Sequence, residues 1–198
     1  MVSQDKILTE FYKNDGILST NDLKELVGVS KHETLRNVSK SMNTLISKKI
    51  VGKVRGPKNT SIYFLIAPYE FIMDEYEKSK LLEDFCMNIV RKVALEYDNC
   101  KTFEKNGTII LKYGNSYQIR NYLKILKLIM DYFNKPINYI LHDNYLLVTK
   151  NLHVEIDVFN VESLISEMDK TLEKNKKGLN LLNTEVKYTF TRKKSYEE

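Results

Sequence analysis

Residues 28–66 read GVSKHETLRNVSKSMNTLISKKIVGKVRGPKNTSIYFLI, and this stretch decides the fold of the first third of the chain. Ser30 followed by Glu33 forms a capping box, which satisfies free backbone N–H groups at a helix start, so we expect a helix from Lys31. Apolar residues then recur at steps of three and four and form one stripe: Leu35, Val38, Met42, Leu45 and Ile46. One side of the helix should pack, and the polar side should be free to contact a partner.

The polar side of this helix leads into a second basic element. It carries Lys31, His32, Arg36, Asn37, Lys40, Ser41, Asn43 and Ser47. Residues Ile50–Val54 and Ser61–Ile66 then have the composition of strands, and RGPKNT between them is a turn with Arg55 and Lys58 near its ends. The pattern therefore predicts a basic helix followed by a basic hairpin.

The positive charge of the chain is confined to its first third. Residues 31–58 hold eight basic side chains and a single acid, Glu33, whereas residues 68–198 hold twenty of each sign. The formal net charge of +5 therefore belongs to residues 1–67. Clustered cations on a helix and a hairpin favour a polyanion site, such as a nucleic acid, over a solvated charged face.

The residues before this stretch complete a small helical domain. Gln4–Lys13 is an amphipathic helix capped by Ser3 and ended by the turn at 14–16, and Ile17-Leu18 is a short bridging strand. Residues 19–22 read STND and supply caps for a second short helix, which Gly28 ends. A short helix, a tight turn with a glycine and a capped longer helix form a helix-turn-helix arrangement.

With the first helix and the hairpin added, residues 3–66 resemble the winged helix-turn-helix regulators of bacteria and archaea. The resemblance rests on ILST before the second helix, on VSKHETLRNVSKSMNTL as the recognition helix, and on KKIV opening the wing. One departure is Lys49, where such proteins often carry a glycine. The resemblance implies that the recognition helix enters the major groove of DNA and that the wing lies along the adjacent backbone or minor groove.

This resemblance implies two kinds of DNA-contacting side chain. Those expected at base edges are Arg36, Asn37 and Lys40, flanked by Lys31, His32 and Ser41. Arginine can donate two hydrogen bonds to guanine, and asparagine can pair with adenine. Those expected at phosphates are Lys48, Lys49, Lys53, Arg55 and Lys58.

Pro68 marks a boundary, after which Tyr69–Tyr97 has a helical pattern, as one bent helix or as two with Ser79 as a cap. Its apolar stripe includes Phe85, Ile89 and Val93. Such a stripe can belong to an ordinary core helix, but most helix-turn-helix readers are two-fold dimers, so we expect a homodimer built through this region.

The remaining residues, 100–198, predict a second domain of mixed type. Strands are expected at 108–113, 138–142, 145–149, 154–159 and 185–191, helices at 116–133 and 161–172, and a charged loop at 174–178. Hairpin turns between successive strands favour a largely antiparallel sheet with helices on one face. The fold class is therefore α+β, with domains at 1–67, 68–99 (a helical linker) and 100–198.

Acidic residues of the second domain allow an alternative function. Glu155 and Asp157 alternate on one expected strand, and His142 and Asp143 end an earlier one, so Asp143, Glu155 and Asp157 could hold a divalent metal for a nuclease or nucleotidyltransferase of replication or recombination. The same alternation is what a half-exposed strand shows. Because no phosphate-cradling glycine loop, HExxH motif or nucleophile motif is present, we expect no enzyme, no catalytic residue, no metal and no cofactor.

The expected function is sequence-specific binding of double-stranded DNA by a homodimeric transcriptional regulator, whose second domain serves dimerisation, effector sensing or partner contact. Cys86 and Cys100 lack metal-ligand spacing and are expected to be structural thiols. We find no targeting segment and no apolar run of the ~18 residues that a membrane span needs, so a cytoplasmic protein without membrane contact is expected.

Overall fold

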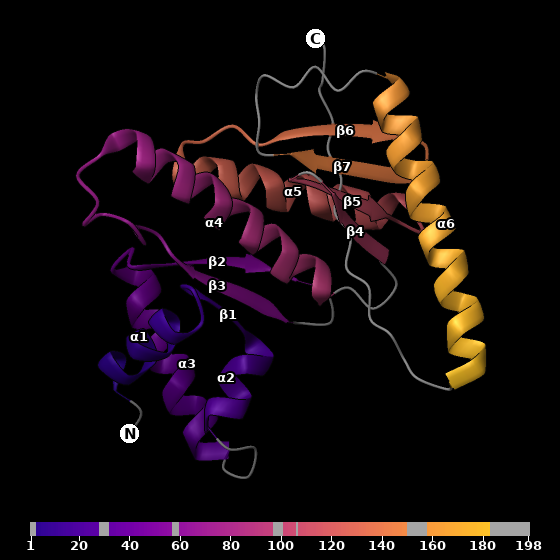
Figure 1. The fold of residues 1–198 in the computed structure, drawn as a ribbon. Coiled ribbons are helices and arrows are strands. Elements are labelled where there is room, and N and C mark those ends of the chain that lie inside the picture. The colour runs from indigo at the N-terminus through magenta and orange to yellow at the C-terminus, as the bar shows by residue number, and fades with distance from the viewer. Residues whose placement is uncertain are drawn as a thin grey trace. The chain divides into compact units, whose positions relative to one another are not determined.

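The computed structural model describes residues 3–27, 32–56, 60–96, 101–105, 107–149 and 158–182. The chain forms two compact units, one comprising residues 1–97 and 121–135 and the other residues 98–120 and 136–198. Each contains helices and an antiparallel sheet, which confirms the α+β class (Figure 1). Within the described residues no helix combines the length and the apolar character that crossing a membrane requires.

The first unit opens with three helices and a three-stranded sheet. Its elements in chain order are α1 (Gln4–Lys13), β1 (Ile17–Ser19), α2 (Thr20–Val27), α3 (His32–Ser47), β2 (Val51–Arg55) and β3 (Ser61–Leu65). The sheet has the order β1-β3-β2, and both pairings are antiparallel. All six elements agree with the sequence prediction to within one residue at most ends.

Side-chain caps fix where the first two helices begin. The Lys6 N–H donates to Ser3 Oγ at 3.2 Å, which is the cap expected for α1. Ahead of α2, the Asp22 N–H donates to Ser19 Oγ at 3.1 Å and the Ser19 N–H donates to Asp22 Oδ2 at 2.6 Å. This reciprocal pair satisfies two backbone donors at once and ties the strand β1 to the start of α2.

The end of α3 has a specific backbone geometry. The Ile50 N–H donates to the Leu45 carbonyl and the Lys49 N–H donates to the Ile46 carbonyl, each at 3.0 Å, which is the Schellman pattern. Lys49 is the residue that reverses the chain, and its φ is +56°. This left-handed conformation favours glycine, so a lysine is held here at a steric cost.

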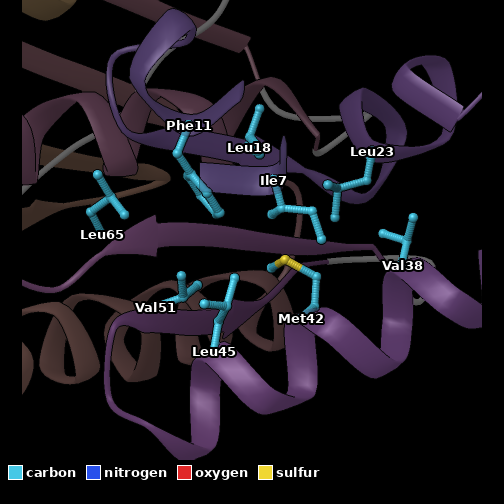
Figure 2. Packing of buried hydrophobic residues seen from close by; sticks show 9 residues of the cluster. All are labelled: Ile7, Phe11, Leu18, Leu23, Val38, Met42, Leu45, Val51 and Leu65. Atoms are coloured by element: carbon cyan, nitrogen blue, oxygen red, sulfur yellow. The ribbon is translucent and has the colours of Figure 1, made fainter. Parts of the chain in front are cut away.

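The core of these elements lies between α3 and α1. Figure 2 shows that side chains from α3 point toward those from α1, α2 and the sheet. The buried cluster consists of Ile7, Phe11, Leu18, Leu23, Val38, Met42, Leu45, Val51 and Leu65. Because Val38, Met42 and Leu45 face inward, the rotation of α3 about its axis is fixed.

Helix α4 (Glu75–Leu95) corrects the expectation of a helix from residue 69. Asp74 is its N-cap and accepts from the Glu77 N–H at 2.7 Å, so residues 69–73 precede the helix and Ser79 lies inside it. The apolar stripe expected to join two copies is buried within a single chain, including Phe85, Ile89 and Val93. The core-helix interpretation therefore holds for this stripe, and α4 groups with the first unit.

The first unit also includes α5 (Ser116–Phe133) from residue 121 onward, and the bounds of this helix agree with the prediction. The Phe133 ring lies 5.5 Å from the Phe64 ring and 5.8 Å from the Phe85 ring, centroid to centroid. The Tyr132 ring lies 5.2 Å from that of Phe64. These aromatic contacts join β3, α4 and α5 into one packed layer.

The second unit contains a four-stranded antiparallel sheet of order β4-β5-β7-β6. Its strands are β4 (Lys101–Lys105), β5 (Thr108–Lys112), β6 (Asn138–His142) and β7 (Tyr145–Thr149). Strands β5, β6 and β7 were predicted, whereas β4 was not. Every residue of β7 is buried, as expected for an interior strand.

Helix α6 (Val158–Leu182) overturns two predictions for the second unit. Val158 and Phe159 belong to the helix and not to a strand, and residues 174–178 continue the helix and do not form a loop. Residues 154–157 of the expected strand, and the last expected strand at 185–191, lie outside the described residues. The apolar side chains Val161, Leu164, Met168 and Leu172 recur at steps of three and four and are buried.

Polar contacts attach α6 to the sheet of the second unit. Asp169 Oδ1 lies 2.9 Å from Lys112 Nζ, and the buried Tyr145 hydroxyl donates to Asp169 Oδ2 at 2.7 Å. Burial alone would lower the pKa of Lys112, but hydrogen bonds and charge from Tyr145 and Asp169 raise it overall. Lys105 and Glu167 form a second ion pair at 2.5 Å, about as exposed as the first.

Candidate nucleic-acid interface

The candidate interface is built on α3, whose packed side determines what the other side presents. Lys40 is exposed, and it has no acidic partner among the residues whose side chains the structure describes. Ser39, Asn43 and Ser47 are also exposed. The described half of α3 therefore presents one cation among small polar side chains, as expected from the sequence.

Ser41 contradicts the prediction that it lies on the polar side. Only 4% of Ser41 is exposed, so its hydroxyl does not belong to the outward face. The physical reason is the helical repeat: Val38, Ser41, Met42 and Leu45 follow the spacing i, i+3, i+4, i+7, which defines one buried stripe. Ser41 is a polar member of that stripe and is withdrawn as a base contact.

The remaining side chains expected at base edges are not placed. The backbone of His32, Arg36 and Asn37 lies in α3, but their side chains lie outside the described part of the chain. Lys31, and Lys58 of the hairpin, lie outside it entirely. Their roles stay predictions.

The hairpin β2–β3 presents its cations on the side that faces α3. Val51 packs in the core with Met42 and Leu45, and side chains alternate along a strand, so Lys53 and Arg55 project on the same side as Val51. Both are exposed. The opposite side of the hairpin consists of buried residues: Gly52, Val54, Ile62 and Phe64.

A tyrosine that the sequence analysis did not single out orients one of these cations. Lys53 and Tyr63 are directly paired across the hairpin, and Lys53 Nζ lies 5.5 Å from the centroid of the Tyr63 ring. A cation over an aromatic face is attracted by the ring quadrupole. The sequence did not indicate this contact, because the register that puts residue 53 opposite residue 63 follows from the closure of the hairpin at Gly56 and Thr60.

Two further lysines lie where α3 meets the hairpin. Lys48 is exposed, and its Nζ lies 3.4 Å from Gln4 Oε1. Lys49 is exposed at the left-handed turn and has no acidic partner among the described side chains. We refer to Lys40, Lys48, Lys49, Lys53 and Arg55 together as the basic surface.

The helix before this surface is held by a charged contact. Lys92 Nζ on α4 lies 2.9 Å from Asp22 Oδ2, so the carboxylate that caps α2 also pairs with α4. Burial would raise the pKa of the Asp22 carboxyl, but the Ser19 N–H and the Lys92 ammonium lower it overall. The charged form of Asp22 is thus stabilised where α2 begins.

The alternative metal site gains no support from the described residues, among which no group of three or more His, Cys, Asp or Glu side chains could hold a metal ion. His142 Nδ1 lies 3.5 Å from Asp143 Oδ2 at the β6–β7 turn. Glu155 and Asp157 lie outside the described residues.

No known family model, curated protein or solved structure matches the chain.

Proposed function

We propose that this chain binds double-stranded DNA through α3 and the β2–β3 hairpin, as a winged helix-turn-helix transcriptional regulator. The observation that carries the proposal is the basic surface, whose exposed cations lie on elements fixed by one buried core. No acid occurs between Lys40 and Lys58 to offset them. A localised surface of this kind is suited to neutralising phosphates.

The order of elements supports this choice over a general polyanion surface. Two helices joined by a short connection, α2 and α3, are followed by a hairpin whose strand β3 also pairs with β1. In a winged helix-turn-helix the second of these helices enters the major groove. Here α3 takes that place, and the hairpin takes the place of the wing.

The proposal assigns different tasks to the two elements. Arg36, Asn37 and Lys40 on α3 read base edges, where arginine and asparagine side chains can form paired hydrogen bonds. Lys49, Lys53 and Arg55 contact phosphates, which position the protein and carry no sequence information. No catalytic step is proposed.

Binding as a two-fold pair of copies stays a prediction. The stripe on α4 from which it was inferred is buried within one chain. Palindromic half-sites in the selected DNA would be its signature, because operator symmetry mirrors protein symmetry.

The test is a selection of bound sequences from a random DNA pool with the full chain, followed by titrations across a salt series. If about five cations meet phosphates, log affinity should fall with log salt at a slope of about −4 to −5. Absence of an enriched motif together with a flat salt response would refute the proposal.

Single substitutions distinguish residues that read base edges from residues that position the protein on phosphates. Arg36→Ala or Asn37→Ala should lose about 1–3 kcal/mol on the selected site and much less on scrambled DNA. Lys53→Ala should weaken both DNAs alike and reduce the salt slope by about one. Lys170→Ala, which removes an exposed lysine of α6, is the matched control and should change neither quantity.

A further inference from the structure

The segment immediately before and at the start of α4 exposes large apolar side chains. Phe71, Met73 and Tyr76 are 76%, 91% and 81% exposed, the highest values among the large apolar residues that the structure describes. They fall within six consecutive residues. Isolated exposed apolar residues are ordinary, but three together mark a contact surface.

The same segment is strongly acidic. Residues 70–77 read EFIMDEYE and contain four carboxylates and no base. Asp74 caps α4, and Glu75 Oε1 lies 3.4 Å from Lys78 Nζ, so both have local roles. Glu70 and Glu77 are exposed and have no basic partner among the described side chains. We call residues 70–77 the acidic aromatic segment.

Charge decides which surface can cover this segment. Nucleic acid and anionic membrane repel its carboxylates. A two-fold contact through the segment would oppose four carboxylates to four others, which is also unfavourable. The complementary surface is cationic, and the chain itself carries one.

We propose that the acidic aromatic segment of one copy docks head to tail on the basic surface of a second copy, and that DNA competes with it for that surface. The carboxylates meet Lys49 and Lys53, while Phe71 and Tyr76 lie against lysine ammonium groups and their alkyl stems. The competition rests on the proposed function, whereas the docking itself does not.

A head-to-tail contact leaves one unused segment and one unused surface on every pair, so it propagates beyond dimers. The segment is smaller than the roughly 20–30 residues that each partner contributes to a standard interface, so the association should be weak, on the order of 100 μM. Because charge contributes, raising the ionic strength shortens its range and weakens the association.

Two variants with complementary defects test the geometry. Glu70→Lys with Phe71→Ser disables the segment and leaves the Asp74 cap intact, and Lys49→Glu with Lys53→Glu disables the surface. Each alone should be mostly monomeric in sedimentation velocity at about 200 μM protein and low salt, with affinity reduced at least about tenfold. Mixed in equal amounts, they should form dimers and nothing larger, whereas the unmodified chain assembles further.

The control changes the same kinds of residue elsewhere. Tyr117→Ser with Glu162→Lys alters an exposed tyrosine and an exposed acid of the second unit, and it should assemble as the unmodified chain does. Far-UV circular dichroism verifies that all variants are folded. An unmodified chain that stays monomeric, variants that each form dimers alone, or a mixture that does not associate would each overturn the docking.

Addition of a duplex of about 20 base pairs tests the competition. Dispersal of the assemblies into complexes of one duplex with one copy or with a two-fold pair supports it, and larger assemblies that persist with DNA bound overturn it. A separate titration of dilute monomeric protein with the same duplex reports the proposed function. Failure to bind there would refute DNA binding while leaving the docking intact.

Discussion

Replacing Lys49 with glycine should strengthen the fold and weaken DNA binding at the same time. Lys49 has a φ of +56° at the end of α3. A side chain in this region costs roughly 1–2 kcal/mol, and glycine removes that cost but gives back about 0.5–1 kcal/mol through its greater freedom when unfolded. The net gain is therefore about 0.5–1 kcal/mol in the free energy of unfolding.

In a chain of this length, such a gain raises Tm by about 1–4 °C. The same substitution removes one cation of the basic surface, so the slope of log affinity against log salt should shrink by about 0.9. Thermal unfolding followed by circular dichroism gives the first quantity, and titration of the selected duplex at several salt concentrations gives the second.

The neighbouring residue provides a matched control. Lys48→Gly removes a charge next to Lys49, but Lys48 is not among the described residues with positive φ, so glycine there should lower stability by about 0.5–1 kcal/mol. Opposite shifts in Tm with similar losses of DNA affinity are the expected result. If Lys49→Gly lowers Tm as much as Lys48→Gly, the argument from backbone strain is wrong.

Three further predictions concern the first unit. Gly52→Ala places a Cβ 2.3 Å from the buried Phe64 ring and should cost about 1–3 kcal/mol in urea denaturation, whereas Gly114→Ala, with its nearest neighbour at 3.5 Å, should change little. Asp22→Asn should flatten the acid limb of stability: the folded pKa of Asp22 is lowered, so its contribution is present above the usual value of about 3.9 and lost as pH falls through the folded pKa, a loss that should make Tm fall more steeply toward acid pH for the unmodified chain than for the variant, which keeps its other carboxylates. Burial raises the pKa of the Cys86 thiol to about 12. In a Cys100→Ser background, a thiol reagent at about pH 8 should therefore modify Cys86 only after denaturant is added. Rapid labelling of the native protein would contradict the burial of Cys86.

The helices were predicted well where the sequence carried both a capping residue and apolar residues at helical spacing. Ser3, Ser19 and Asp22 signal the starts of α1 and α2, and apolar steps of three and four run through α3 and α5. The start of α4 carried the same kind of signal, because Asp74 and Glu77 have capping-box spacing. The apolar residues at 71–73 obscured it by extending the helical pattern backwards.

The second unit was predicted less completely for identifiable reasons. Asn106-Gly107 is a strong hairpin signal in the sequence, and a hairpin turn needs a strand before it, which is β4. Residues 174–178 read KNKKG and were interpreted as a loop because they are charged. Three of these five residues are lysine, which is a strong helix former, and α6 continues through them.

For the candidate interface, the sequence pattern predicted which types of residue would be present, but not all of their positions and contacts. Exposure of Lys40, Lys49 and Lys53 follows from which neighbours are apolar. Burial of Ser41 could have been found by giving the i, i+3, i+4, i+7 spacing precedence over polarity. The contact of Lys53 with Tyr63 required the pairing register of two strands, which depends on the closure of the hairpin.

The sharing of α5 between the two units bears on how the protein is made. Phe133 completes the aromatic layer around Phe64 and Phe85, yet it lies beyond Lys101–Lys112, which belong to the other unit. During synthesis the first 97 residues therefore emerge from the ribosome without the side chains that finish their core. The nascent chain must wait, with Phe64 and Phe85 incompletely covered, until residues 121–135 have been added. The order of translation and the order of folding differ here, so this unit cannot be completed as an independent N-terminal module.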